Sequence, residues 1–263
     1  MIHTKTAFLG LWKIRKGRDI NYLDDPSVSS LHRKIIQEKL FLRKLYMDFY
    51  GDLKSRIFGD SAKKFLVELG SGGGFIKQVM PNVITSDITG SVPLDIQFSV
   101  ESIPFKDNSV DAFLLLNVFH HIANPLNCLK EMNRCLKSDG KIIMIEPANT
   151  LWRRFIDKNF HHEKFDTNAG WENSGNGPLT TANGAMPWII FSRDRALFER
   201  GFPTLKIRSI ELHTNFRYIV SGGLTYRQLL PSFMYSIIKA LEWLTSPLNK
   251  YLGFFQTIEL EKN

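Results

Sequence analysis

Cysteines and long apolar runs are both scarce in this 263-residue chain. Its only two cysteines, Cys128 and Cys135, are too few for a disulfide framework or a cysteine-rich metal site. No apolar run reaches the roughly eighteen residues of a membrane-spanning helix, and the N-terminus lacks the apolar core of a signal peptide. His161, His162 and Glu163 are adjacent but have no partner motif, so we predict no metal site. We therefore expect a cytoplasmic protein with reduced thiols.

Acidic residues are the minority among the charged ones. The chain has 34 Lys and Arg against 26 Asp and Glu, for a formal net charge of +8, and 43% of its residues are hydrophobic. The apolar fraction is ordinary for a folded domain with its own core. The positive charge is compatible with nucleic acid, an anionic membrane surface or a phosphorylated substrate, and charge alone does not choose among them.

A glycine-rich stretch at residues 64–87, KFLVELGSGGGFIKQVMPNVITSD, is the most informative part of the sequence. The apolar run at 65–69 is typical of a strand buried on both faces of a parallel sheet. A short helix is expected over 75–80, followed by a second buried strand over 83–86. This order of strand, glycine loop, helix and strand predicts a nucleotide-binding α/β unit.

The glycines of this loop leave one stretch of backbone without side chains. Gly70, Gly72 and Gly74 follow the spacing G-x-G-x-G, which lets a ligand approach the backbone closely. Asp87 ends the second strand, where such units bind a ribose hydroxyl pair. With Glu68 in front of the loop, the pattern E-x-G-x-G-x-G resembles motif I of the class I S-adenosylmethionine-dependent methyltransferases.

This resemblance implies a cofactor site for S-adenosylmethionine. In the family the loop binds the methionine end of the cofactor, and the acidic residue after the second strand binds the ribose. The residues that the resemblance places at the methionine end are Glu68, Gly70, Ser71, Gly72 and Gly74. Asp87, with Ile88 beside it, falls at the ribose.

The segment from 94 to 122 resembles the next motifs of the type 11 group of small-molecule methyltransferases. The family usually has an aspartate where this chain has Ser99, which would bind the adenine amino group without charge assistance, at a loss of roughly 1 kcal/mol. The backbone amide of Val100 would meet the adenine ring. The resemblance places Asn117, at the end of the fourth strand, beside the transferred methyl group.

His120 and His121 follow that strand and are the candidate catalytic residues. A histidine there could deprotonate an acceptor hydroxyl, because its ordinary pKa lies near working pH. The alternative is that it packs or hydrogen-bonds beside the cofactor without exchanging a proton. The segment lacks the Asn-Pro-Pro-Tyr signature of methyltransferases that act on the amino groups of nucleic acid bases or glutamine.

The remaining periodicities predict an α/β fold of the class I methyltransferase type, a mostly parallel, seven-stranded, doubly wound sheet. Residues 1–60 are expected to form an N-terminal helical cover, with its helices broken at Gly51. Residues 61–263 are expected to form the methyltransferase domain. Within it, an acceptor-binding lid is expected at about 150–190 and an apolar insertion at about 216–253, before a final antiparallel strand at 254–261.

We therefore expect S-adenosylmethionine-dependent methyl transfer to a small molecule, and the aromatic tail favours an apolar or lipid-linked acceptor. The tail either closes over the acceptor, meets lipid at the inner face of a membrane, or packs on the domain. Two other functions stay open. An RNA or DNA methyltransferase fits the charge, although no nucleic-acid module is apparent, and a non-catalytic scaffold would fit if Ser99 and other departures abolish cofactor binding.

Overall fold

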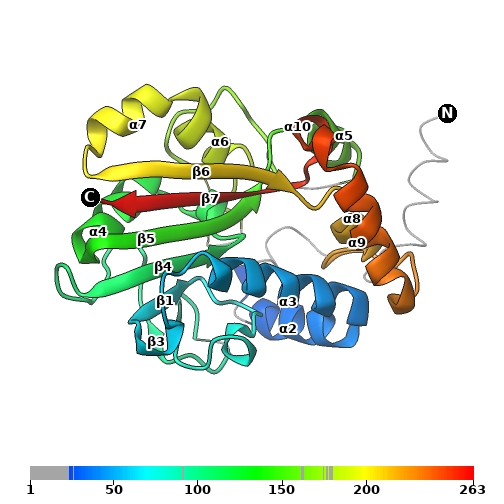
Figure 1. Cartoon of the computed structure of the whole chain (residues 1–263), viewed down its shortest axis with the longest axis horizontal. Coiled ribbons are helices and arrows are strands. Elements are labelled where there is room, and N and C mark those ends of the chain that lie inside the picture. The colour runs from blue at the N-terminus through cyan, green and yellow to red at the C-terminus, as the bar shows by residue number, and fades with distance from the viewer. Residues whose placement is uncertain are drawn as a thin grey trace.

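A central sheet organises the chain, with helices on both of its faces (Figure 1). The computed structural model describes residues 24–25, 27–90, 92–160, 163–173, 175, 177 and 180–263. Within them the sheet has seven strands in the order β3-β2-β1-β4-β5-β7-β6. The strands are β1 (Leu66–Leu69), β2 (Ile84–Asp87), β3 (Ile96–Gln97), β4 (Val110–Leu116), β5 (Leu136–Pro147), β6 (Leu205–His213) and β7 (Phe255–Lys262).

The first five strands are parallel, and β7 runs antiparallel to its neighbours β5 and β6. This arrangement confirms the predicted fold class, including the antiparallel final strand. Every residue of β1 is buried, as expected for a strand covered on both faces. The carboxyl ends of β1, β2, β4 and β5 therefore meet along one edge of the sheet, where ligands bind in open α/β folds.

Two hydrophobic cores lie on opposite faces of the sheet. One packs α4 (Pro125–Cys135), α6 (Met186–Trp188), η5 (Ile189–Arg193) and α7 (Arg195–Gly201) against it. The other packs α3 (Leu40–Ser55) and α9 (Tyr235–Leu244), with the short η3 (Ile76–Gln78). Because both faces are covered, the central strands β1 and β4 are buried almost throughout, whereas polar and apolar residues alternate in the edge strand β6.

Two sequence predictions about helices were wrong. Gly51 does not break the N-terminal helical region, because α3 continues through it, and the break falls instead between α2 (Ser27–Glu38) and α3, at Lys39. The helix predicted over 75–80 is only the three-residue 3₁₀ turn η3. Such a turn is too short for its N-terminus to attract a ligand through a helix dipole.

Several short elements complete the chain. The connection from β4 to α4 contains η4 (Phe119–His121), and η2 (Ser61–Lys63) precedes β1. After β5 comes α5 (Leu151–Phe160). Between β6 and β7 lie α8 (Arg217–Val220), η6 (Ser232–Met234), α9, η7 (Ser246–Leu248) and α10 (Asn249–Leu252). No helix among the described residues is long and apolar enough to cross a bilayer. His161 and His162 lie outside the described residues.

Candidate cofactor and acceptor site

The glycine loop after β1 needs two of its glycines for their backbone conformation. Gly70 and Gly72 have positive φ values of 65° and 44°, which L side chains rarely adopt. A Cβ on Gly70 would lie 2.6 Å from both Cγ atoms of Val118, so this glycine also lets β1 and the loop after β4 approach each other. At Gly72 the nearest atoms would be 3.8 Å away or more, so its surroundings are open.

At the other two glycines, the N-terminal helices occupy the space that a side chain would need. A Cβ on Gly73 would lie 2.5 Å from the backbone N of Arg33 in α2. One on Gly74 would lie 2.4 Å from the hydroxyl of Tyr50 in α3, which also accepts the N–H of Phe75 at 3.1 Å. These two glycines therefore let α2 and α3 pack directly against the loop.

Asp87 holds the loop to the end of β2. Its carboxylate accepts the N–H of Gly72 at 2.8 Å and the N–H of Thr89 at 2.9 Å. The N–H of Ser71 also donates to the carbonyl of Ser86 at 2.8 Å. The structure thus brings the loop and Asp87 together, and Asp87 fixes the position of the backbone at Gly72.

Two buried polar atoms next to the loop have no hydrogen-bond partner among the described residues. They are Oε2 of Glu68, a residue only 2% exposed, and Oγ of Ser71. Burial, opposed by the nearby Ser71 hydroxyl and reinforced by the negative charge of Asp87, raises the pKa of Glu68 to about 7. Unsatisfied buried oxygens are costly, and a cationic ligand with N–H donors would satisfy both. S-Adenosylmethionine, which has an ammonium group and a sulfonium, is a ligand of this kind.

The remaining predicted cofactor residues lie at the carboxyl ends of β2, β3 and β4. The N–H of Phe98 donates to the carbonyl of Asp87 at 3.1 Å, which sets Ser99 and Val100 near the end of β2. The Ser99 hydroxyl accepts the N–H of Glu101 at 3.3 Å. Ile88 is largely exposed. Asn117 adopts a φ of 56°, and this left-handed conformation turns the chain sharply after β4.

The loop after β4 is held by Glu146, which sits near the end of β5 and is completely buried. Its Oε1 accepts the N–H groups of Val118 and Phe119 at 2.8 and 2.7 Å. Its Oε2 lies 2.5 Å from Nδ1 of His120. Burial alone would lower the pKa of His120, but the carboxylates of Glu146 and Glu163 raise it to about 9. His120 is therefore charged at neutral pH.

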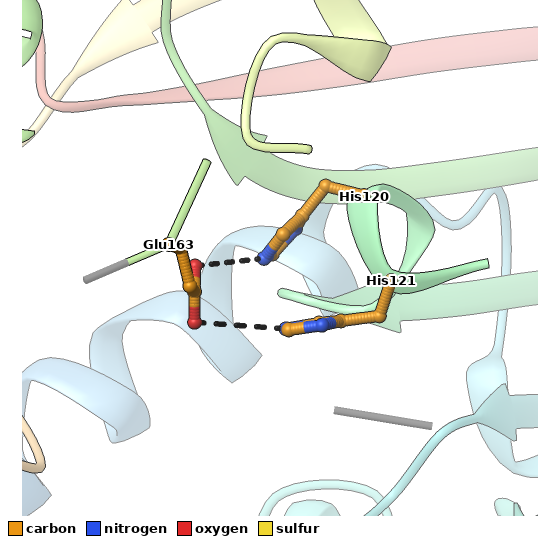
Figure 2. Close-up of side chains that lie close together, drawn as sticks. All are labelled: His120, His121 and Glu163. Carbon is orange, nitrogen blue, oxygen red and sulfur yellow. Dashed lines mark ion pairs between the residues drawn. The ribbon is translucent and has the colours of Figure 1, made fainter. Parts of the chain in front are cut away.

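His121 has the opposite protonation state. Its ring lies 4.1 Å from that of His120, and burial together with the charge of His120 lowers its pKa to about 4. Figure 2 shows Glu163 facing both rings: its carboxylate oxygens lie 3.7 Å from Nε2 of His120 and 4.0 Å from Nε2 of His121. Nδ1 of His121 is buried and has no hydrogen-bond partner among the described residues, although the nearby backbone of Thr181 acts to raise the pKa of the ring. His121 is thus neutral and able to accept a hydrogen bond.

The same three side chains could ligate a divalent cation. One donor atom from each of His120, His121 and Glu163 lies within 4.8 Å of the others. Glu146 behind His120 is the carboxylate that often orients a ligating histidine. However, a cation would have to displace the proton of His120 that Glu146 and Glu163 stabilise. The absence of a metal stays a prediction.

A cleft of about 350 Å³ opens beside this cluster, and Glu163 is one of its walls. From α5 it is lined by Arg154, Asp157 and Lys158, and from the following segment by Phe165 and Thr167. Its lining combines two basic side chains, two acidic ones, one hydroxyl and one aromatic ring, and Glu163 joins it to the histidines. The predicted lid region, about 150–190, supplies all six of these residues.

Sequence reasoning missed two residues of this site, Glu146 and Tyr50. Glu146 carried a usable signal, since an acidic residue near the end of a buried strand needs a partner. Tyr50 carried none, because its contact with the glycine loop spans 25 residues. Glu163 was considered only with its neighbours His161 and His162, whereas the structure brings it to His120 and His121.

Comparison with known proteins identifies the central part of the chain. Residues 67–144 match the family model described as a methyltransferase domain, Methyltransf_11. A 113-residue stretch, 41% of this chain, is 27% identical to the ubiquinone/menaquinone biosynthesis C-methyltransferase UbiE of Hahella chejuensis. The aligned stretch covers 44% of the UbiE protein. This chain therefore spans less than half the length of the curated relatives that it matches.

Solved structures share the fold at low sequence identity. A methyltransferase from Thermotoga maritima, described as a possible histamine N-methyltransferase, aligns with a TM-score of 0.54 at 15% identity. The alignment covers 89% of this chain and 99% of that one. A geranyl diphosphate methyltransferase aligns with a TM-score of 0.50 at 12% identity, over 84% and 79% of the two chains. Together with the site geometry, the family match shows that this chain carries a class I S-adenosylmethionine-dependent methyltransferase domain.

Proposed function

We propose that this protein transfers the methyl group of S-adenosylmethionine to an apolar or lipid-linked small molecule. The observation that carries the cofactor assignment is the pair of unsatisfied buried oxygens, on Glu68 and Ser71, beside an open Gly72. Glu68, Ser71 and the loop backbone would hold the methionine end, and Asp87 the ribose. When bound, the cofactor supplies an electrophilic methyl group.

The cleft beside His121 supports the choice of acceptor. Arg154 and Lys158 offer positive charge to a phosphate or another anionic group, and Phe165 offers an apolar contact. The geranyl diphosphate methyltransferase that shares this fold acts on a molecule of that mixed character. We also propose that the protein lies at the inner face of a membrane, which it would contact with apolar residues between β6 and β7.

His121 and His120 have different roles in this proposal. His121 is neutral at working pH and would accept a hydrogen bond from an acceptor hydroxyl at Nδ1. With a pKa of about 4 it is a weak base, so it orients the acceptor more than it removes a proton. His120 is a positioning residue, because its ion pair with Glu146 fixes the loop that presents His121. Much of the rate would come from holding the acceptor in line with the methyl group.

The test is methyl transfer from isotopically labelled S-adenosylmethionine to isoprenyl phosphates and diphosphates, with transfer RNA as a competing acceptor. We expect label in the organic-soluble product, and a loss of about tenfold for Lys158→Glu, because the variant repels an anionic head group. Lys206→Glu is the control, since Lys206 is an exposed lysine on β6, away from the cleft. Label confined to RNA would contradict the proposed acceptor class.

A further inference from the structure

The helix α9 buries its one acidic residue together with Tyr235 and Ile238 and leaves most of its aliphatic side chains exposed. Its charged residue Glu242 is only 7% exposed and pairs with the buried guanidinium of Arg217, Nε to Oε2, at 2.5 Å. Glu242 Oε1 also accepts the N–H groups of Phe216 and Arg217 at 2.8 and 2.7 Å. A helix of a water-soluble protein normally turns its apolar side inward and its charges outward. Here the carboxylate faces the protein.

The outer side of the same region is apolar. Phe233 is 77% exposed and Trp243 75% exposed, values rarely found for such large side chains. Phe233, Ile237, Leu241, Leu244 and Leu248 recur every three or four residues and are all exposed. Ile237, Leu241 and Leu244 share one side of α9 at helical spacing, and Phe233 in η6 and Leu248 in η7 are exposed at its two ends.

Neighbouring elements extend this apolar surface. The short helix α10 packs against α5, and Figure 1 shows α5, α10, α8 and α9 together at one end of the molecule. We call the exposed apolar residues of these elements the apolar face. They are Leu151, Phe155, Phe160, Phe233, Ile237, Leu241, Trp243, Leu244, Leu248 and Tyr251.

The exposed charges within the segments that form the apolar face are all positive. Residues 149–160 and 226–255 contain only two acidic residues, Asp157 and Glu242. Both are buried in ion pairs, Asp157 with Arg153 at 2.7 Å and Glu242 with Arg217. The exposed charged residues of these segments are Arg154, Lys158, Arg227, Lys239 and Lys250. Of these, Lys239 pairs with Asp48 of α3 at 2.7 Å.

We propose that the apolar face docks the protein on an anionic lipid bilayer. Aromatic and aliphatic side chains among lysines and arginines, with no exposed carboxylate in residues 149–160 and 226–255, match the chemistry of an anionic membrane surface. A second copy of this chain would set like charges against each other across a symmetric contact, which disfavours self-association. The inference rests on the proposed function, since a lipid-linked acceptor would enter the cleft of Arg154 and Lys158 from this side.

The experiment measures binding of the full chain to vesicles, with neither cofactor nor acceptor present. Sedimentation is compared for phosphatidylcholine vesicles and for vesicles containing one third phosphatidylglycerol. We expect binding to the anionic vesicles, and at least about a tenfold weaker partition coefficient for the double variant Ile237→Ser and Leu244→Ser. The matched control is Leu197→Ser, since Leu197 is a half-exposed leucine on α7, at the other end of the molecule, and should leave binding unchanged.

Three outcomes would overturn the inference. One is that the native chain fails to sediment with anionic vesicles at low salt. The second is binding that is lost at high salt but is equally strong for the native chain and the double variant, because such binding would depend on net charge alone. The third is a native dimer that the double variant converts to a monomer, which would make a second copy the occupant. Titration of the same variants with S-adenosylmethionine separates these results from failure of the proposed function, because cofactor binding should be unaffected.

Discussion

We predict that S-adenosylmethionine binding releases a proton from Glu68. The side chain is buried, and its pKa of about 7 leaves it about half protonated at neutral pH. The positive charges of the cofactor would stabilise the carboxylate in this low-dielectric site and lower its pKa. Binding and deprotonation of Glu68 are therefore linked.

The size of the effect follows from the two pKa values of Glu68. If the cofactor returns the pKa from about 7 to its ordinary 4.5, binding releases about half a proton at pH 7 and about 0.9 near pH 5.8. Since the slope of log affinity against pH equals the number of protons released, the affinity should rise about twentyfold between pH 5.5 and 7.5.

The assay is calorimetric titration at each pH in two buffers with different enthalpies of ionisation. The difference in binding enthalpy between the buffers gives the number of protons released. Glu68→Gln keeps the shape of the side chain but cannot titrate, so it should release none and show no rise in affinity over this range. Release of fewer than about 0.2 protons at pH 6 by the native protein would refute the assigned role of Glu68.

Other predictions concern the stability of the site, measured by urea unfolding. Glu146→Ala should cost about 3–5 kcal/mol, because it leaves the buried, charged His120 with only the more distant Glu163 and leaves the N–H groups of Val118 and Phe119 without their acceptor; a cost below about 1 kcal/mol would contradict this. The pKa of His120 rises from 6.5 unfolded to about 9 folded, so its contribution of about 3 kcal/mol is complete below pH 6.5 and is lost as pH rises through 9. The contribution is measured as the difference in unfolding free energy between the native protein and Glu146→Gln. An equal difference at pH 6 and at pH 9.5 would show that His120 is not charged. Gly70→Ala should cost about 1–3 kcal/mol, because of its positive φ and the contact with Val118, whereas Gly170→Ala, in open space, should cost little.

Much of the fold could be predicted from local sequence. Each of β1, β4 and β5 contains a run of consecutive buried and mostly apolar residues, because these strands are covered on both faces. The position of Asp87 followed from the end of such a run. By contrast, the helix expected over 75–80 is only a 3₁₀ turn. Tyr50 of α3 packs against Gly74 and accepts the N–H of Phe75 just before this turn, and local sequence does not encode such long-range contacts.

The orientation of α9 could not be predicted either. Helical spacing identifies a stripe of apolar residues, but it does not say which side of the helix faces the protein. The ion pair of Glu242 with Arg217, together with the hydroxyl of Tyr235, which accepts from Arg217 at 2.7 Å, determines the inner side. The partners of Glu242 come from 25 residues earlier in the chain, so only the folded structure reveals them.

The measurement that tests the central claim most directly is calorimetric titration of the native protein and two aspartate variants with S-adenosylmethionine. Asp87→Asn removes the charge at the proposed ribose site, whereas Asp95→Asn, the control, changes an aspartate that instead binds Thr85 at 2.8 Å and Lys77 at 2.6 Å. We predict binding by the native protein and by Asp95→Asn, and a loss of at least about tenfold for Asp87→Asn, which equals about 1.4 kcal/mol. No binding by the folded native protein, or equal binding by both variants, would contradict the cofactor site.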